Sequence, residues 1–481
     1  MVPKVQNGHL CGCREADSRS WRWPGEAPVM TNIGINEPPI VVIGAGLTGM
    51  AVAMILAKRN LPVVVLERDP RDAFGRSGEY PLRRTGAPHG NRPHALLAGG
   101  RDVLLRSLPE VAREVHRLGA RDATAWPGSP ATPESTLLVL RRTLLERALL
   151  ECAQNLPTLT LRFGEPVLDL IVTNGHRSPV SGVRTSVTAL PARLVIDASG
   201  IHGRMLRATE CSETDCVSLR SRIYYTSQPL RLTRQGYDAA IGAGAVWIKS
   251  PAPSVVHVRL FLHDAPYASI LLVVRSDDHT PSREFIEGAY RAVMSDNELQ
   301  PYCQGAVCLA PIETIGYLGA RLRLLDTERS FQPGLLPIGD ALAQVNPLTS
   351  RGATLGLIQA EALATCIAHN VSDYLSQCET LLRTYHEWVV PNWADSVIRD
   401  KFLQPDLKLP DKVNEAVDLA RRRWRLAFAT NQLTELATRV AQLQTPPSAI
   451  DNSVKAVVPS VARFAMPSSS MGSCDPPIYD R

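Results

Sequence analysis

Apolar positions follow three different patterns along this chain. Near the N-terminus two continuous apolar runs, at 40–43 (IVVI) and 63–67 (VVVLE), flank the stretch LTGMAVAMILAKRN. Such runs predict strands buried on both faces of a parallel sheet, with a helix between them. Between residues 206 and 325, segments such as VVHVRLFLHD alternate and predict further strands. Apolar residues at helical spacing predict helices from 373 to 445.

Three glycines stand between the first predicted strand and its helix. Gly44, Gly46 and Gly49 form G-x-G-x-x-G, a pattern that allows a tight turn, a pyrophosphate close to the backbone, and close packing of helix and strand. The helix N-terminus offers N–H groups to phosphates. Glu67 ends the second strand about 20 residues on, where a carboxylate accepts bonds from ribose hydroxyls and repels a 2′-phosphate. The pattern predicts a dinucleotide site that does not take NADPH, and it leaves NAD and FAD open.

A second strand-to-helix turn is predicted far along the chain, in GLLPIGDALAQVNPLTSRGATLGLIQAEA from residue 334. A strand ends in Gly339 and Asp340, a loop carries Asn346 and Pro347, and a helix follows Gly352. An NAD protein has no use for such a distant loop. A flavin does, because Asp340 offers an acceptor to its ribityl chain and a helix start stabilises charge on its reduced ring. The second turn therefore favours FAD.

Composition adds few limits. With 481 residues, 44% of them hydrophobic, the chain fits a soluble protein of two or three domains. The net charge is +5 and the basic residues are scattered along the chain, so nucleic-acid binding is not indicated. No apolar run reaches the ~20 residues that a membrane-spanning helix needs. The start of the chain lacks a secretory signal, so we expect reduced thiols and a cytoplasmic location. The C-x4-C cysteine pairs are too widely spaced for a zinc knuckle, and we predict no metal site.

Five passages resemble, in order, the motifs of one flavoprotein family. They are VVIGAGLTGM…VVVLERD, GNRPHALLAGGRDVLLRSLPEVAREVHRLGA at 90–120, RRTLLERAL at 141–149, LVIDASGIHGR at 194–204 and PIGDALAQVNPLTSRGA. The chain resembles the FAD-dependent monooxygenases of the para-hydroxybenzoate-hydroxylase-like superfamily, and among them the polyketide epoxidases of polyether biosynthesis. The resemblance implies an α/β fold, in which a Rossmann-like FAD-binding domain is interleaved with a mixed β-sheet substrate domain and followed by a C-terminal helical segment.

This plan divides the chain into five parts. We expect a disordered N-terminal extension at 1–37, an FAD-binding domain at 38–100, 136–205 and 326–372, a substrate domain at 101–135 and 206–325, a helical region at 373–445, and a disordered tail at 446–481.

The resemblance also assigns residues to the cofactor. Those implied to bind FAD are Gly44, Ala45, Gly46, Gly49, Glu67, Arg68, Arg92, Arg142, Asp340, Pro347, Gly352 and Ala353. Among them the glycines of the first motif would meet the pyrophosphate and Glu67 the adenosine ribose. Arg142 would reach the phosphates or the ribityl chain, Asp340 the ribityl chain, and Gly352 the isoalloxazine. His94, on a loop that runs near the flavin in relatives, is the candidate catalytic residue.

Two positions depart from the family pattern. Ser350 replaces the first glycine of N-P-x-x-G-x-G. Because serine tolerates a positive φ poorly, we expect a differently shaped loop or a less tightly held flavin. Arg141 replaces the family serine beside Arg142 and would add a charge near the cofactor.

Each candidate also has an ordinary structural interpretation. Asp197, in VIDASG, is suited to capping the end of a strand. His94 is open to a purely structural role. Arg142 and Glu146 have the i,i+4 spacing of a helical ion pair, and Asp340 is suited to capping a helix.

The resemblance implies a monooxygenase in which reduced flavin and O2 form a C4a-hydroperoxide that oxidises an apolar, natural-product-like substrate. Electrons would come from NAD(P)H that docks transiently or from a partner flavin reductase. No motif in the sequence marks a general base. Because hydroxylation of a phenol profits from such a base and epoxidation of an alkene does not need one, this favours epoxidation. Three alternatives stay open: a flavin halogenase, although its W-x-W-x-I-P signature is missing; a geranylgeranyl-reductase-like enzyme; and a non-oxidative flavin-binding accessory protein.

Overall fold

The computed structural model describes most of the chain from residue 37 onward. The described residues are 37–74, 84, 86–87, 90, 93–124, 132–172, 179–202, 205, 216–243, 246–277, 279–317, 319–327, 330–429 and 433–457. They belong to one compact unit. The predicted N-terminal extension lies outside them apart from residue 37, as do Arg92 and the tail beyond residue 457.

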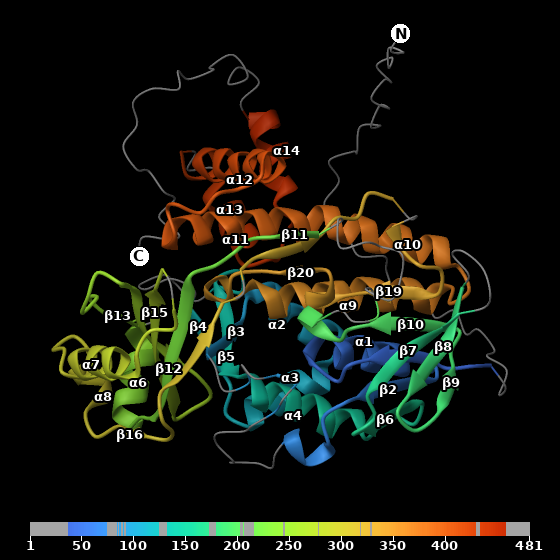
Figure 1. The fold of residues 1–481 in the computed structure, drawn as a ribbon, viewed down its shortest axis with the longest axis horizontal. Helices are drawn as coiled ribbons and strands as arrows, with labels where there is room; N and C mark the ends of the chain where they lie inside the picture. The colour runs from blue at the N-terminus through green and yellow to red at the C-terminus, as the bar shows by residue number, and fades with distance from the viewer. Residues whose placement is uncertain are drawn as a thin grey trace, which may run out of the picture. The chain divides into compact units, whose positions relative to one another are not determined.

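The predicted parallel sheet is present, with five strands in the order β19–β10–β1–β2–β6 (Figure 1). The strands are β1 (Ile40–Ile43), β2 (Val63–Glu67), β6 (Leu159–Phe163), β10 (Leu194–Asp197) and β19 (Leu335–Pro337). All neighbouring pairs are parallel, and every strand except β6 is buried throughout, as continuous apolar runs require. Because these strands come from widely separated segments, the predicted interleaving is confirmed.

Helices pack against this sheet and against one another. They are α1 (Leu47–Lys58), α2 (Ala98–Ser107), α3 (Pro109–Arg117), α4 (Arg142–Ala153) and α9 (Arg351–His369). α1 contacts both α4 and α9, α2 contacts α9, and α3 contacts α4. The prediction placed residues 101–135 in the substrate domain, but α2 and α3 pack on the helices of the dinucleotide-binding part instead.

Three small antiparallel sheets accompany this part. Their strands are β3 (Pro93–Leu96), β5 (Thr136–Arg141) and β4 (Arg121–Thr124); β7 (Val167–Val172), β8 (Val180–Thr185) and β9 (Ala189–Pro191); and β11 (Cys216–Ser218), β18 (Arg321–Arg323) and β20 (Ala343–Gln344). Val180 and Val183 of β8 pack on Val41 and Val195 of the parallel sheet, which extends the core on that side.

The second large sheet has the order β13–β14–β15–β12–β16, with β17 also beside β12. Its strands are β12 (Ile223–Arg231), β13 (Val246–Trp247), β14 (Val255–Leu262), β15 (Tyr267–Arg275), β16 (Val307–Cys308) and β17 (Glu313–Gly316). We predicted a mixed sheet, but the pairs described here are all antiparallel. Alternation in the sequence indicates which face is buried and does not indicate strand direction.

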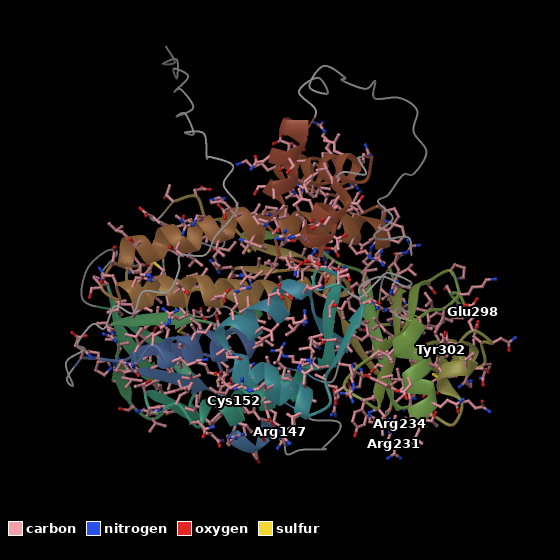
Figure 2. The ribbon with its side chains drawn as sticks, turned by 180° about the vertical axis from the view of Figure 1, so that it is seen from behind. Arg147, Cys152, Arg231, Arg234, Glu298 and Tyr302 are labelled. Atoms are coloured by element: carbon pink, nitrogen blue, oxygen red, sulfur yellow. The ribbon has the colours of Figure 1, made fainter. Side chains whose placement is uncertain are left out.

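One face of this antiparallel sheet is covered by α6 (Arg234–Ala243), α7 (Arg283–Met294) and α8 (Gln300–Cys303). Figure 2 labels Arg234 of α6, Tyr302 of α8, and Glu298 in the turn between α7 and α8. Ser282 caps α7, its side chain accepting from Phe285 N at 3.2 Å. The opposite face of the sheet packs against the second strand-to-helix turn, where Leu348 lies.

The C-terminal region is helical, as predicted, but it extends further. Its helices are α10 (Tyr374–Thr384), α11 (Val390–Leu403), α12 (Asp411–Ala429), α13 (Thr434–Ala441) and α14 (Ser448–Val457), with a π-helical turn at Tyr385–Val389. α14 lies in the tail that we predicted to be disordered. Arg423 of α12 pairs with Asp451 of α14 at 2.9 Å, and both Trp424 and Ile450 are completely buried. Among the described helices, none combines the length and apolarity that crossing a membrane requires.

Candidate functional site

The first turn, between β1 and α1, is shaped by glycines. Gly44 has φ +102°, and a Cβ there would lie 2.7 Å from the carbonyl oxygen of Ala198, just after β10. A Cβ at Gly49 would lie 2.0 Å from the carbonyl oxygen of Gly44. Both distances are too short for a carbon atom, so only glycine lets the turn, α1 and β10 come this close.

Gly46 differs because the protein leaves room beside it. It is the N-cap residue of α1, no side chain caps the helix there, and the first helical turn holds no acidic residue. A Cβ on Gly46 would have Arg142 Nη2 as its neighbour, at 3.7 Å. An uncapped helix start beside a guanidinium suits a phosphate group, because its N–H groups and dipole bind anions. The residues present therefore fit a dinucleotide pyrophosphate.

The second turn packs directly on the first. A Cβ at Gly339 would lie 3.1 Å from Thr48 Oγ1, and one at Gly356 would lie 2.2 Å from the same oxygen. Thr48 belongs to the first turn of α1. Burial raises the pKa of Asp340, while the nearby Arg142 lowers it. Two segments from distant parts of the sequence therefore meet at the start of α1.

Arg142 lies between these two turns. Its Nε donates to Glu146 Oε1 at 2.8 Å, which is the helical ion pair that the spacing allows. Its Nη2 lies beside Gly46, and its charge acts on Asp340. The helical pair and a role at the cofactor are therefore compatible in one side chain.

Glu67, at the end of β2, is buried and already accepts three hydrogen bonds. Oε2 accepts from Ala45 N at 2.8 Å and from Arg84 Nη2 at 2.7 Å, and Oε1 accepts from Asp69 N at 3.0 Å. These three donors are described residues, and a carboxylate, with about four acceptor positions, is also a group that accepts hydrogen bonds from ribose hydroxyls. Arg68 beside it is exposed.

Arg84 is a site residue that the sequence pattern does not reveal. Besides Glu67 it binds Asp69 Oδ2 through Nε at 3.0 Å and Glu146 Oε2 through Nη1 at 2.8 Å, and its guanidinium lies 3.9 Å from the centre of the Phe74 ring. Burial alone would lower its pKa, but Glu146, Glu67 and Asp69 raise it. An arginine in PLRRTG has neither periodicity nor motif spacing to mark it.

The loop from Asn346 to Ser350 leads into α9. Ser350 has φ +53° and ψ 17°, a left-handed conformation that glycine adopts readily and serine does not. No side chain caps α9, and its first turn holds no acidic residue. Pro347 is exposed, while Gly352 and Ala353 are half-buried. This open helix start fits the charge that gathers on a reduced flavin ring.

Residues from other elements hold this loop, and no motif or periodicity marks them in the sequence. Tyr225 of β12 donates to Asn346 Oδ1 at 2.9 Å, and Asn346 Nδ2 donates to Asp400 of α11 at 2.6 Å. Arg351 binds Asp395 of α11 at 2.8 Å in a buried pair. The C-terminal helices therefore form part of the support of the second turn.

Arg141 and His94 lie toward the hairpin between β14 and β15. The Nη2 and Nε of Arg141 bind the carboxylate of Asp264 at 2.7 and 2.9 Å, and its guanidinium lies 4.2 Å from the centre of the Tyr267 ring. Arg141 therefore connects β5 to this hairpin, and its charge is paired with that of Asp264. His94 on β3 is half-buried beside His263. Burial, together with Arg141 and His94, lowers the pKa of His263 to about 3.

The capping roles suggested for Asp197 and Asp340 have different outcomes. Asp197 is fully buried at the end of β10, and its Oδ1 accepts from Ser199 N at 3.0 Å, as a residue that caps a strand end does. Asp340 lies inside a short 3-10 helix, Gly339–Ala341, whereas the N-cap of α9 is Ser350. Asp340 therefore does not cap α9.

Residues 39–126 match the family model DAO, described as FAD dependent oxidoreductase. No curated protein is detectably similar to the chain. PqsL of Pseudomonas aeruginosa, described as a probable FAD-dependent monooxygenase, is 18% identical over 80% of this chain and 100% of its own, with a TM-score of 0.56.

Two further solved structures have the same fold at low identity. The p-nitrophenol 4-monooxygenase PnpA of Pseudomonas putida DLL-E4 is 14% identical over 85% of this chain and 97% of its own, with a TM-score of 0.57. The flavin-dependent brominase Bmp2 is 14% identical over 88% and 99%, with a TM-score of 0.60. The resemblance seen in the motifs is confirmed for the fold: residues around the first turn match an FAD dependent oxidoreductase model, and the chain has the fold that these monooxygenases share with the brominase.

Proposed function

We propose that the chain is an FAD-dependent monooxygenase that inserts one oxygen atom of O2 into an apolar, natural-product-like small molecule. The observation that carries the proposal is the meeting of Gly46, Arg142 and Asp340 at the start of α1. This arrangement offers a cation and helix N–H groups to a pyrophosphate, and a carboxylate to a ribityl chain. The uncapped start of α9 supplies the matching site for the flavin ring.

In this proposal, different residues bind different parts of FAD. The N-terminus of α1 and Arg142 bind the pyrophosphate. Glu67 accepts a hydrogen bond from a ribose hydroxyl, and Asp340 binds the ribityl chain. The backbone at Gly352 and Ala353 meets the ring. Bound FAD supplies the chemistry that activates oxygen, and the protein excludes water and orients the substrate.

The substrate in this proposal lies against the inner face of the antiparallel sheet. There Tyr225, Leu271 and Val273 cluster with Leu348 of the loop before α9. Phe261 on the same sheet packs with residues of β3 and β5. Tyr225, Leu271, Val273 and Phe261 are themselves buried in the protein, so an apolar substrate would meet the half-buried members of the first cluster, Leu348 and Val256.

Neither of the two described histidines of this sheet is suited to act as a general base. Burial and Arg399 lower the pKa of His257 well below its ordinary value, and burial lowers that of His263 to about 3. A general base works best when its pKa lies near the working pH, so neither histidine is suited to deprotonating a phenol. Epoxidation of an alkene needs no such base.

The test begins with the absorption spectrum of the purified protein after addition of FAD. The protein is then supplied in air with NADH, NADPH or a flavin reductase, together with apolar alkenes and isotopically labelled O2. We expect a yellow protein, reductant consumption, and one labelled oxygen atom in the product. Asp340→Asn should weaken FAD binding by about tenfold, whereas the exposed Arg234→Ala on the outer layer serves as the matched control.

Other outcomes point elsewhere. A protein that stays colourless with FAD overturns the proposal. A product that depends on bromide indicates a halogenase, reduction of a double bond without oxygen indicates a reductase, and FAD binding without turnover indicates an accessory role.

A further inference from the structure

Asn346 joins three elements around the loop that leads into α9. It is completely buried, and its Oδ1 accepts from Leu348 N and from the Tyr225 hydroxyl, both at 2.9 Å. Its Nδ2 donates to Oδ1 of Asp400 at 2.6 Å. Because two donors point at its oxygen, the amide has one favourable orientation, and its nitrogen faces Asp400.

We propose that Asp400 is a positioning residue for flavin binding. Its carboxylate holds the Asn346 amide, and through this amide it keeps the loop up to Ser350 in the conformation that receives the flavin ring. The hydrogen bond to the amide weakens when Asp400 takes up a proton. The proposal rests on the proposed function, because it assumes that the start of α9 receives a flavin. A carboxylate accepts a stronger hydrogen bond than a neutral carboxyl group does. The hold matters because Ser350 keeps a left-handed conformation only if its surroundings impose it.

The surroundings of Asp400 let it change protonation near neutral pH. Burial raises its pKa to about 7, against hydrogen bonds from Asn346 and from the Tyr317 hydroxyl at 3.4 Å. The ionisable and charged groups around it are Tyr225 on β12, Tyr317 after β17, Asp340 before α9, Arg399 beside it on α11, and His257 and Arg259 on β14, next to Arg399. Burial raises the pKa of both tyrosines and lowers that of His257, so these three stay neutral.

The test is a titration of the flavin-free full-length chain with FAD, followed by flavin fluorescence from about pH 5.5 to about pH 8.5. We expect the affinity for FAD to be about fivefold higher at the upper end, because the charge-assisted bond is present there, with a midpoint near the pKa of about 7. Asp400→Asn has the same size but cannot ionise. It should lack the step in affinity near pH 7 and bind FAD more weakly than the wild type at high pH, while Asp340, whose pKa is also raised, titrates in both proteins.

Tyr317→Phe separates positioning from a merely structural role. It removes a hydrogen bond that lowers the pKa of Asp400, so the midpoint should move to higher pH while the affinity at high pH is kept. A midpoint that does not move, or an equal pH dependence in the wild type and in Asp400→Asn, overturns the positioning role alone. If the wild type binds no FAD at any pH, the proposed function fails and this proposal fails with it.

Discussion

The two turns that meet at the start of α1 are built in different ways. The first is formed by backbone, since Gly44 and Gly49 leave no room for a Cβ. The second reaches α9 through Ser350 in a left-handed conformation, and Asn346 connects it to Asp400 on a distant helix. A turn formed by closely spaced glycines can be recognised in a sequence. The second turn can also be recognised, but the side chains that hold it cannot, because they become neighbours only after folding.

The largest expected effect comes from replacing the buried arginine beside each turn, which is Arg84 at the first turn and Arg351 at the second. Arg84→Met removes the cation that Glu67, Asp69 and Glu146 share. Removing one partner of a buried ion pair costs about 3–5 kcal/mol, and we expect at least that loss in the free energy of unfolding measured with urea.

Arg351→Met is the matched variant at the second turn. Arg351 binds Asp395, which keeps a hydrogen bond from Trp424 Nε1 at 3.0 Å. We expect a smaller loss than for Arg84→Met, because fewer buried carboxylates lose a cation. Equal losses would contradict the view that the first turn depends more on its arginine.

The glycines of the first turn separate folding from binding. Gly49→Ala should reduce the free energy of unfolding by about 2–4 kcal/mol, since its Cβ would collide with the carbonyl oxygen of Gly44. Gly46→Ala should stay within about 0.5 kcal/mol of the wild type but bind FAD about tenfold more weakly, because its methyl group enters the phosphate space. Urea unfolding and FAD titration measure the two effects. If Gly46→Ala also unfolds easily, the space beside Gly46 is not reserved for a ligand.

This difference explains what the sequence could predict. Apolar runs and glycine spacing are local, so they predicted the parallel sheet and both turns. Arg84 and Asp400 are ordinary polar residues in unpatterned segments, and their roles arise only from tertiary contacts. The Pro- and Ser-rich composition of the tail suggested disorder, yet α14 forms where Ile450 is buried and Asp451 pairs with Arg423. Composition does not reveal such a partner.

Asp197 lies where the two turns approach each other, and it predicts a pH dependence of stability. Its carbonyl accepts from Ile338 N, and burial raises the pKa of its carboxyl. The folded chain therefore holds this proton more tightly than the unfolded chain does. The resulting stabilisation is complete below the unfolded pKa of about 4 and is lost as pH rises through the folded pKa.

Asp197→Asn removes this dependence at one position. We expect the free energy of unfolding of the variant to fall less steeply than that of the wild type as the pH rises above about 4, because the amide cannot lose a proton. Asp340 and Asp400 also have raised pKa values and keep part of the slope. Parallel pH curves for the variant and the wild type would show that Asp197 keeps its charge in the folded protein.

The smallest effect concerns the strain at Ser350. A non-glycine residue in the left-handed region costs about 1–2 kcal/mol, and Ser350 has φ +53°. Ser350→Gly relieves this strain but gives the unfolded chain more conformational freedom, so we expect a net gain below about 1 kcal/mol in the free energy of unfolding. Ser350→Ala is the control, because it removes the hydroxyl and keeps the strain. A gain in the glycine variant alone would show that the second turn is strained in a way that the first avoids, whereas equal behaviour of both variants would assign the effect to the hydroxyl group.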